Sequence, residues 1–423
     1  MGPNRELSLL KDGSSKKKKS AYPILLLFLY LVLEYSRPQE LLPFLRVFKL
    51  PTITLLLLAS AILFSGRLRL EERQSVLFVL ILSIMVIHGP IAVNNYWALM
   101  VFLSMLMNFT VYLGLINYVD DQEKYERLIR TWIWVHVFLA VVGIGKRGRG
   151  IGGFLADEND FCMTMNMIVP ISFFLAFYAS GKEKIFYVVI TGLFLFVIIL
   201  SKSRGGFVGL MAAVTYCLLR TKKKVLAAAL VGMFAIFILA VAPSSYWKEI
   251  HSITEQGSRE GTGEERIYTW RIGWDIFLDN PIIGVGQGNF PYVFGKYELA
   301  AMGTEEAFHG RSVAGRQAHS IYFTLLPELG IIGVSIFTLM ILNMFKDLKL
   351  VRMESMSRKY KTNKVTTLGQ NYFLALGLEG ALISYLVSGV FISILYYPNL
   401  WILMGFVIAL RKISLSGTIS ATA

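Results

Sequence analysis

Long apolar runs separated by short polar connections fill most of the chain. Each run is bounded by charged residues, Pro or Gly, and most approach the roughly 20 residues that a bilayer-spanning α-helix needs. The pattern therefore predicts twelve membrane-spanning helices. Their expected ranges are 21–36, 50–65, 75–93, 96–118, 131–145, 160–180, 185–200, 206–219, 225–242, 321–345, 370–390 and 394–410.

The runs divide the chain into five parts. We expect a basic tail over residues 1–20, followed by nine spans over 21–242. One large polar loop with amphipathic helices follows over 243–320, then three more spans over 321–410 and a short tail over 411–423. The lysines 16–19 before the first span resemble the start of a signal peptide. However, Glu34 to Arg37 stand where a cleavable signal has small residues, which favours an uncleaved anchor.

Positive charge is distributed unevenly between the two sides of the predicted bundle. If the N-terminus is cytoplasmic, the connections on its side carry 27 of the 42 Lys and Arg residues, and the opposite connections carry 15. The positive-inside rule then predicts that both termini lie in the cytoplasm and that the loop 243–320 faces outward.

Composition agrees with a membrane protein. Of the 423 residues, 55% are hydrophobic and only 17% are charged, and the mean hydropathy is +0.57. Such a chain is a poor candidate for a disordered, collagen-like or disulfide-rich protein, or for a soluble nucleic-acid binder. The net charge of +14 fits topology signals, and Cys162 and Cys217 lie in apolar runs, which favours neither a disulfide framework nor a zinc site.

Arg204 stands in S-K-S-R-G-G (201–206), between the seventh and eighth predicted spans. Serines and paired glycines can free the backbone for an anion nest, and a guanidinium can bind phosphate oxygens through two hydrogen bonds. The alternative is an interfacial arginine that extends to the lipid headgroups.

The outer loop contains a predicted amphipathic helix that begins near Arg266. Its aromatic and aliphatic stripe at helical spacing consists of Ile267, Trp270, Trp274 and Phe277. Such a helix could lie on the membrane surface, or cap a cavity and offer Arg266 with the positive helix end to an anion. Alternatively, the stripe only packs and the arginines are solvated.

The segment D-N-P-I-I-G-V-G-Q-G-N-F (279–290) follows this helix. Its G-x-G-x-G string lacks the preceding strand of a nucleotide-binding loop. We therefore expect a tight turn that guides the chain back to the membrane.

His319, in Q-A-H-S-I-Y (317–322), stands where the loop re-enters the bilayer. A neutral imidazole with a pKa near 6.5 can accept a proton from a hydroxyl group, which makes His319 a candidate general base. A structural interfacial histidine is the alternative.

We expect no metal site. Asp157, Glu158 and Asp160 cluster before the sixth span and offer an alternative site for a hard cation, with Glu34 and Glu40 a weaker one. Asp157 and Asn159 equally suit the N-cap of the following helix.

Together these segments resemble the O-antigen ligase and O-antigen polymerase superfamily of bacterial membrane glycosyltransferases. The resemblance covers most of residues 150–345, and the loop and the twelve predicted spans agree with it. The matching pieces are S-R-G-G (203–206), R-x-x-x-W (266–270) with the segment 279–290, and A-H-S-I-Y-F-T-L-L-P-E-L-G-I-I-G (318–333). Residues 37–40 and 157–163 also resemble a subgroup of O-glycosylation ligases associated with exosortase systems.

The resemblance implies the glycosyltransferase C-type architecture and a location in the bacterial inner membrane. It also implies an undecaprenyl pyrophosphate-linked glycan as donor, used on the periplasmic face without metal or cofactor. Arg204 and Arg266 would then bind the pyrophosphate, and His319 would deprotonate the acceptor hydroxyl before an inverting attack. Arg271, Arg311 and Arg316 are supporting candidates, and Glu328 is a structural residue or a partner of His319.

Four functions remain open from the sequence. The first is a ligase that transfers the glycan to lipid A core, and the second is a polymerase that joins lipid-linked repeats. The third is a protein O-glycosyltransferase, and the fourth is a transporter of the lipid-linked glycan. A transporter should carry charged residues within several spans, and Glu34 and Glu379 are almost the only ones. We expect membrane lipids, and no nucleic acid, among the partners.

Overall fold

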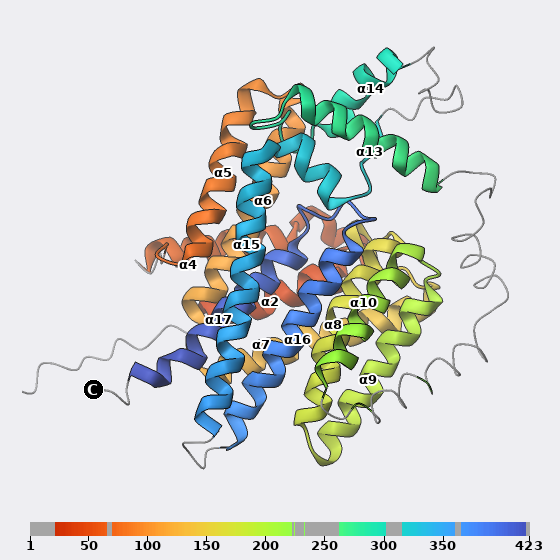
Figure 1. Ribbon diagram of the computed structural model, residues 1–423. Helices are drawn as coiled ribbons and strands as arrows, with labels where there is room; N and C mark the ends of the chain where they lie inside the picture. The colour runs from red at the N-terminus through yellow and green to blue at the C-terminus, as the bar shows by residue number, and fades with distance from the viewer. Residues whose placement is uncertain are drawn as a thin grey trace, which may run out of the picture.

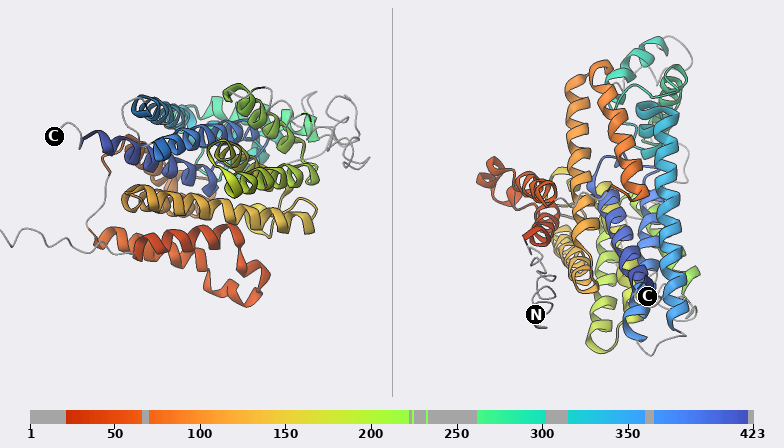
Figure 2. Two further views of the ribbon diagram at one scale, coloured as in Figure 1. Left: turned by 90° about the horizontal axis from the view of Figure 1, so that it is seen from below. Right: turned by 90° about the vertical axis from the view of Figure 1, so that its left-hand side faces the viewer.

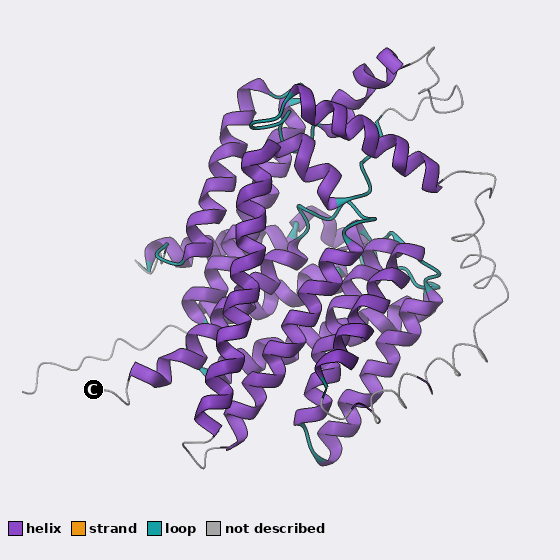
Figure 3. Cartoon of the chain, in the orientation of Figure 1, coloured by secondary structure: helices purple, strands orange, loops and turns teal. Residues whose placement is uncertain are grey.

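The computed structural model describes residues 22–65, 70–221, 224, 232, 262–301, 315–359 and 365–419. All regular structure in these ranges is helical (Figures 1 and 3). Nine helical segments of the described part are long and apolar enough to cross a membrane. The prediction of an all-α polytopic membrane protein is confirmed.

The helices follow the apolar runs. The first half of the chain forms α2 (Tyr22–Ser36), α3 (Pro38–Leu41), the 3-10 helix η1 (Pro43–Phe48), α4 (Leu50–Phe64), α5 (Arg73–Ile91), α6 (Asn95–Tyr118), α7 (Gln122–Gly145), the 3-10 helix η2 (Gly153–Leu155), α8 (Glu158–Tyr178), α9 (Gly181–Leu200) and α10 (Arg204–Arg220). The second half forms α13 (Thr262–Asp279), α14 (Phe290–Ala301), α15 (Ile321–Lys359), α16 (Val365–Ser388) and α17 (Pro398–Ile419).

Most predicted spans coincide with these helices. The ninth, 225–242, falls outside the described residues except for Gly232. The first and eighth correspond to α2 and α10, which have 15 and 17 residues and are shorter than the roughly 20 that a straight crossing needs. The number of crossings therefore stays a prediction.

The tenth predicted span differs in its first part. The helix α15 is broken at Gly330, whose φ of 60° and ψ of −167° are not helical. Residues 321–329 form a short helix of their own before the long helix runs back through the bundle (Figure 1). A Cβ on Gly330 would lie 2.5 Å from the carbonyl carbon of Ile282, so the break also requires a residue without a side chain.

The glycine-rich segment 280–289 packs against this break. The N–H groups of Val285 and Gly286 donate to the carbonyls of Pro327 and Glu328, both at 2.9 Å. The three glycines at 284, 286 and 288 have φ values of 78°, 101° and 69°, which glycine adopts without strain. The predicted tight turn is confirmed, and it leads into α14, while its role in guiding the chain back to the membrane stays a prediction.

A single side chain fixes this turn to α5 and α6. Gln287 is fully buried, and its Nε2 donates at 3.0 Å to the carbonyls of Met85 and Ala98. Its Oε1 lies 3.2 Å from Nδ1 of His88. The conformation of the turn is therefore coupled to the packing of two spans.

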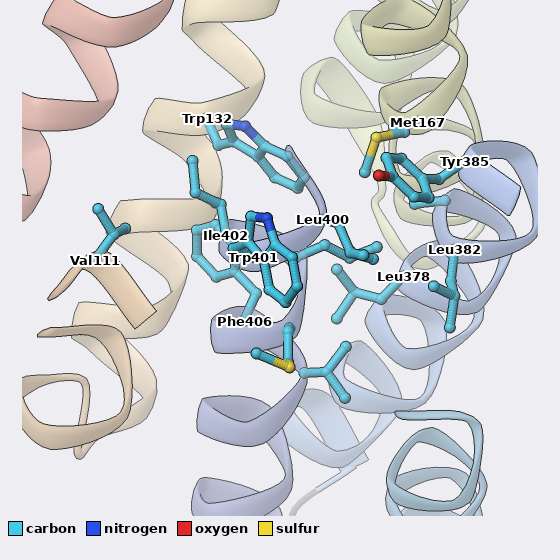
Figure 4. Close-up of a cluster of buried hydrophobic side chains, with 14 of the residues drawn as sticks. Val111, Trp132, Met167, Leu378, Leu382, Tyr385, Leu400, Trp401, Ile402 and Phe406 are labelled. Carbon is cyan, nitrogen blue, oxygen red and sulfur yellow. The ribbon is translucent and has the colours of Figure 1, made fainter. Parts of the chain in front are cut away.

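Large aromatic side chains fill the centre of the bundle (Figure 4). Trp401 of α17 packs against Phe78 of α5 with 4.6 Å between ring centroids, and Trp132 of α7 stacks on Phe406 at 5.2 Å. The helix α8 is buried along most of its length between α9, α10 and α16. This core sets the positions of the helix ends that carry the candidate site.

One end of the bundle is covered by α13 and α14 (Figures 1 and 2). At this end α10 begins beside the start of α8, through the hydrogen bond from Ser203 to Asn159, and α16 ends beside the start of α15, through the one from Ile321 to Gly389. We call it the α13 end and the other the opposite end.

Candidate functional site

Arg204 is the first residue of α10. Ser203 caps this helix, because its Oγ accepts a hydrogen bond of 2.8 Å from the N–H of Gly206. The same hydroxyl donates at 2.6 Å to Oδ1 of Asn159, in the first turn of α8. The start of α10, and with it the backbone of Arg204, is thus tied to the start of α8.

The paired glycines do not form the anion nest that the sequence suggested. Gly205 and Gly206 are helical, in the first turn of α10. A Cβ on Gly206 would lie 2.5 Å from Cβ of Cys162, and one on Gly209 would clash with Oγ of Ser388. The glycines therefore permit close packing of α10 against α8 and α16, and Arg204 stands at a helix N-terminus in place of a nest.

Asp157 caps α8, which is one of the two roles that the sequence left open for it. Its carboxylate accepts hydrogen bonds from the N–H groups of Asn159 at 2.8 Å and Asp160 at 3.4 Å. Among the described residues, no group of three or more His, Cys, Asp or Glu is arranged to hold a metal ion.

Arg266 lies in the first turns of α13 and is half-buried. The face of α13 that packs is not the predicted stripe, because Ile267 and Trp274 are 66% and 47% exposed. Ile272 and Ile276 are buried instead, in a small cluster with residues of α14 and Ala318. Only Trp270 of the predicted stripe contacts the bundle through a ring stack, with Phe323 at 5.1 Å.

His319 adopts a left-handed backbone with φ of 47°. Such a conformation costs about 1–3 kcal/mol for a non-glycine residue and needs support from its neighbours. The carbonyl of Ala318 accepts a hydrogen bond of 2.8 Å from Nε1 of Trp270, and the N–H of Ile321 donates at 2.7 Å to the carbonyl of Gly389. The turn that presents His319 is thus held from α13 on one side and from the end of α16 on the other.

Electrostatic interactions connect these residues to one another. Burial and the nearby guanidinium of Arg204 lower the pKa of Arg266, and the carboxylate of Asp157 opposes this. Burial and the guanidinium of Arg266 lower the pKa of His319, and the carboxylate of Asp157 again acts in the opposite direction. The structure therefore places Arg266 within electrostatic reach of both Arg204 and His319 at the α13 end, and Asp157 within reach of Arg266 and His319.

The supporting candidates fall into different places. Arg316 forms an ion pair with Glu265 and also acts on His319. Arg271 is exposed on α13, and Arg311 lies outside the described residues. The positions of Arg316 and Arg271 do not indicate a role in binding an anion.

Glu328 is buried and bound to the glycine-rich turn. Its carboxylate accepts hydrogen bonds from the N–H groups of Gly288 and Phe290 at 2.8 and 3.1 Å, and from the hydroxyl of Tyr396 at 2.6 Å. These three donors satisfy the buried carboxylate of Glu328. They favour a structural role over a role as the partner of His319.

The segment 37–40 packs next to the residues that precede α8. The guanidinium of Arg37 lies 4.6 Å above the ring of Phe154 and bonds Glu34 at 3.1 Å. A Cβ on Gly153 would clash with Nη1 of Arg37. Residues 37–40 therefore contact the connection that precedes the segment 157–163, while the exosortase-associated subgroup stays a prediction.

Sequence reasoning missed two contributors to the site. Asp157 was considered only as a cap or a metal ligand, although it acts electrostatically on both Arg266 and His319. Trp270 was assigned to a stripe, and its spacing gave no signal for the hydrogen bond to Ala318.

A comparison with known protein families finds one family model that matches a stretch of the chain containing all three candidate residues. Residues 188–338 match the family model described as O-antigen ligase, and this range contains Arg204, Arg266 and His319. The match supports the relation to the O-antigen ligase superfamily and, in general terms, a membrane glycosyltransferase of ligase or polymerase type. No curated protein matches the chain at a significant level.

Proposed function

We propose, with the O-antigen ligase match as the premise, that this protein transfers a glycan from undecaprenyl pyrophosphate to an acceptor hydroxyl on lipid A core. The reaction takes place at the periplasmic face of the bacterial inner membrane. The observation that carries the proposal is the meeting of Arg204, Arg266 and His319 at the α13 end.

The charges suit the leaving group. A lipid pyrophosphate departs with two or three negative charges, and fixed guanidinium groups stabilise that charge more in the transition state than in the ground state. Arg266 is half-buried, and burial together with Arg204 works against its positive charge. A bound diphosphate between the two guanidiniums removes this repulsion.

His319 suits the role of general base. Partial desolvation and the guanidinium of Arg266 lower the pKa of His319, so the imidazole is neutral at neutral pH, and the residue still has surface that an incoming acceptor can reach. The imidazole takes the hydroxyl proton while the acceptor oxygen bonds the anomeric carbon. The bond from that carbon to the pyrophosphate oxygen breaks, the electron pair leaves with the lipid pyrophosphate, and the configuration inverts.

The orientation follows from charge. With the α13 end in the periplasm, the lysine-rich connections 220–224 and 346–364 and both termini lie in the cytoplasm. The donor's polyprenyl chain then stays in the bilayer while its diphosphate reaches the three residues.

The transporter is the weaker alternative. Each carboxylate that the sequence placed within a span pairs with arginine: Glu34 with Arg37, and Glu379 with Arg220 at 2.9 Å and with Arg352. Such pairs suit the packing of helices better than a path for a solute, although paired charges also occur in transporters.

Purified protein incubated with undecaprenyl pyrophosphate-linked glycan and one of three acceptors tests the proposal. Core lipid as the glycosylated product supports the ligase, whereas a lengthened donor or a glycosylated peptide identifies the polymerase or the protein transferase. Movement of the donor across reconstituted vesicles without any new glycosidic bond would contradict an enzyme.

A further inference from the structure

A polar cavity lies at the opposite end of the bundle. Its volume is about 830 Å³, and it is enclosed by the start of α5, the end of α6, and the later turns of α15 and α17. That volume is within the range of small-molecule sites, roughly 300–1,000 Å³. None of the residues proposed for glycan transfer lines it, so it is independent of that function.

The cavity sits at the depth where apolar helices give way to polar sequence. The candidate span of α5 begins at Arg73, and that of α6 ends at Tyr118. Arg73 and Asn117 both line the cavity. Lipid headgroups occupy this depth of a bilayer.

Charge in the lining is balanced. Four cations, Arg73, Lys346, Arg411 and Lys412, face four carboxylates, Glu71, Glu72, Asp120 and Asp347. Arg411 is held inside the protein by Glu72 and by Asp347 at 3.3 Å, and Nζ of Lys412 donates at 2.7 Å to the carbonyl of Ile116. Arg73, Lys346 and Glu71 are exposed, so charges of both signs remain accessible to a ligand.

The cavity wall also contains two buried acceptors that lack a donor. Oε1 of Gln74 and Oδ1 of Asn117 have no hydrogen-bond partner among the described residues, although these side chains are 2% and 5% exposed. Their amide nitrogens are already used, by the carbonyls of Met340 and Leu113. A buried acceptor without a partner is destabilising, so this wall favours a ligand or a water that brings N–H or O–H donors.

We propose that this cavity binds a phosphoethanolamine group, supplied by phosphatidylethanolamine of the surrounding membrane. The phosphate contacts Lys346 and Arg73, and the ammonium donates to Glu71 and to the acceptors of the wall. A purely anionic headgroup would leave the carboxylates without a cation. A choline headgroup carries the same charges but has no N–H group to donate.

Binding of lipids with matched acyl chains tests this. Delipidated full-length protein is titrated with phosphatidylethanolamine, phosphatidylcholine or phosphatidylglycerol, and bound lipid is measured by native mass spectrometry. We expect phosphatidylethanolamine to bind about tenfold tighter than the other two, as several charge-assisted hydrogen bonds allow. Equal binding of the choline lipid, or tighter binding of phosphatidylglycerol, would overturn the proposal.

Two variants locate the site. Lys346→Ala removes an exposed cation and Asn117→Leu removes a buried acceptor, and each should weaken binding of phosphatidylethanolamine about fivefold. Lys182→Ala is the matched control, because Lys182 lines a smaller cavity of about 310 Å³ between α7 and α9. If Asn117→Leu does not fold, Lys346→Ala decides alone, and unchanged binding by this variant would refute the assignment.

Soluble phosphoethanolamine distinguishes the headgroup from the rest of the lipid. Competition with the bound lipid at millimolar concentration supports recognition of the headgroup. Failure to compete at any concentration would assign the binding to the acyl chains and contradict the proposal.

Discussion

Nε1 of Trp270 donates a hydrogen bond of 2.8 Å to the carbonyl oxygen of Ala318, the residue before His319. The same indole stacks on Phe323 with an interplanar angle of 3°. One side chain of α13 therefore contacts the chain on both sides of His319. Because Arg266 precedes Trp270 by one turn of α13, this contact fixes the position of His319 relative to Arg266.

Trp270→Phe should reduce glycan transfer about threefold to tenfold. The phenyl ring keeps an aromatic contact with Phe323 but cannot donate to Ala318, and a neutral hydrogen bond contributes about 0.5–1.5 kcal/mol. The rate of transfer by purified protein measures the effect. Trp274→Phe is the control, because Trp274 is 47% exposed, and an equal loss in both variants would rule out the positioning role.

Transfer should lose rate in acid, with a midpoint below the ordinary pKa of about 6.5 for histidine. Burial and then Arg266 lower the pKa of His319, and only the neutral imidazole accepts a proton. The rate is therefore full at neutral pH and falls as the pH drops through the lowered pKa. A pH profile of transfer measures the midpoint, and one at or above 6.5 disagrees with the environment described.

Two substitutions should move that midpoint in opposite directions. Asp157 raises the pKa of His319 and Arg316 lowers it. Asp157→Asn, which retains a residue suited to cap α8, shifts the midpoint to lower pH, and Arg316→Gln shifts it to higher pH. The pH profiles of the two variants measure both shifts, and shifts of the same sign would show that these charges do not act through His319.

Glu328→Gln should destabilise the protein by about 1–3 kcal/mol, because an amide presents its own N–H groups to backbone donors. The carboxylate accepts from Gly288, Phe290 and Tyr396 in the native protein. Thermal unfolding in detergent measures the loss. Tyr396→Phe removes one of the three donors and should cost less, and a Gln variant as stable as the wild type would show that these bonds contribute little.

Gly206→Ala should destabilise the contact between α10 and α8 by about 1–3 kcal/mol through overpacking. The added Cβ would lie 2.5 Å from Cβ of Cys162, so α10 must shift and carry Arg204 with it. We expect lower thermal stability together with slower transfer. Gly192→Ala in α9 is the control, because no atom lies within 4 Å of its Cβ position, and equal effects would exclude a packing cause.

Hydropathy located the helices well because a span must be apolar over its whole length. It failed at α15, where residues 321–329 are as apolar as a span but turn back at Gly330. That break depends on backbone hydrogen bonds with residues 281–286. These residues are distant in sequence, and they share no hydropathy pattern with the residues around Gly330. A hydropathy pattern carries no information on such a partner.

The three candidate site residues came from their residue types and from resemblance to a family. Their meeting at one end could not be derived from the sequence, because it depends on how α8, α10, α13 and the start of α15 pack. What covers the stripe on α13 was left open by the sequence for a related reason. Periodicity finds an apolar face but does not say whether the bundle or the membrane covers it, and Ile267 and Trp274 remain exposed.

Donor binding and transfer, measured together on four purified variants, test the account most directly. Arg204→Ala and Arg266→Ala should each bind undecaprenyl pyrophosphate more weakly and lose about 10²–10³ in transfer rate. His319→Ala should bind the donor with nearly wild-type affinity and lose transfer, and Arg149→Ala should change neither, since Arg149 is exposed and pairs with Glu158 at 3.0 Å. Wild-type transfer by either of the first two variants would contradict the central claim that their guanidiniums hold the leaving pyrophosphate.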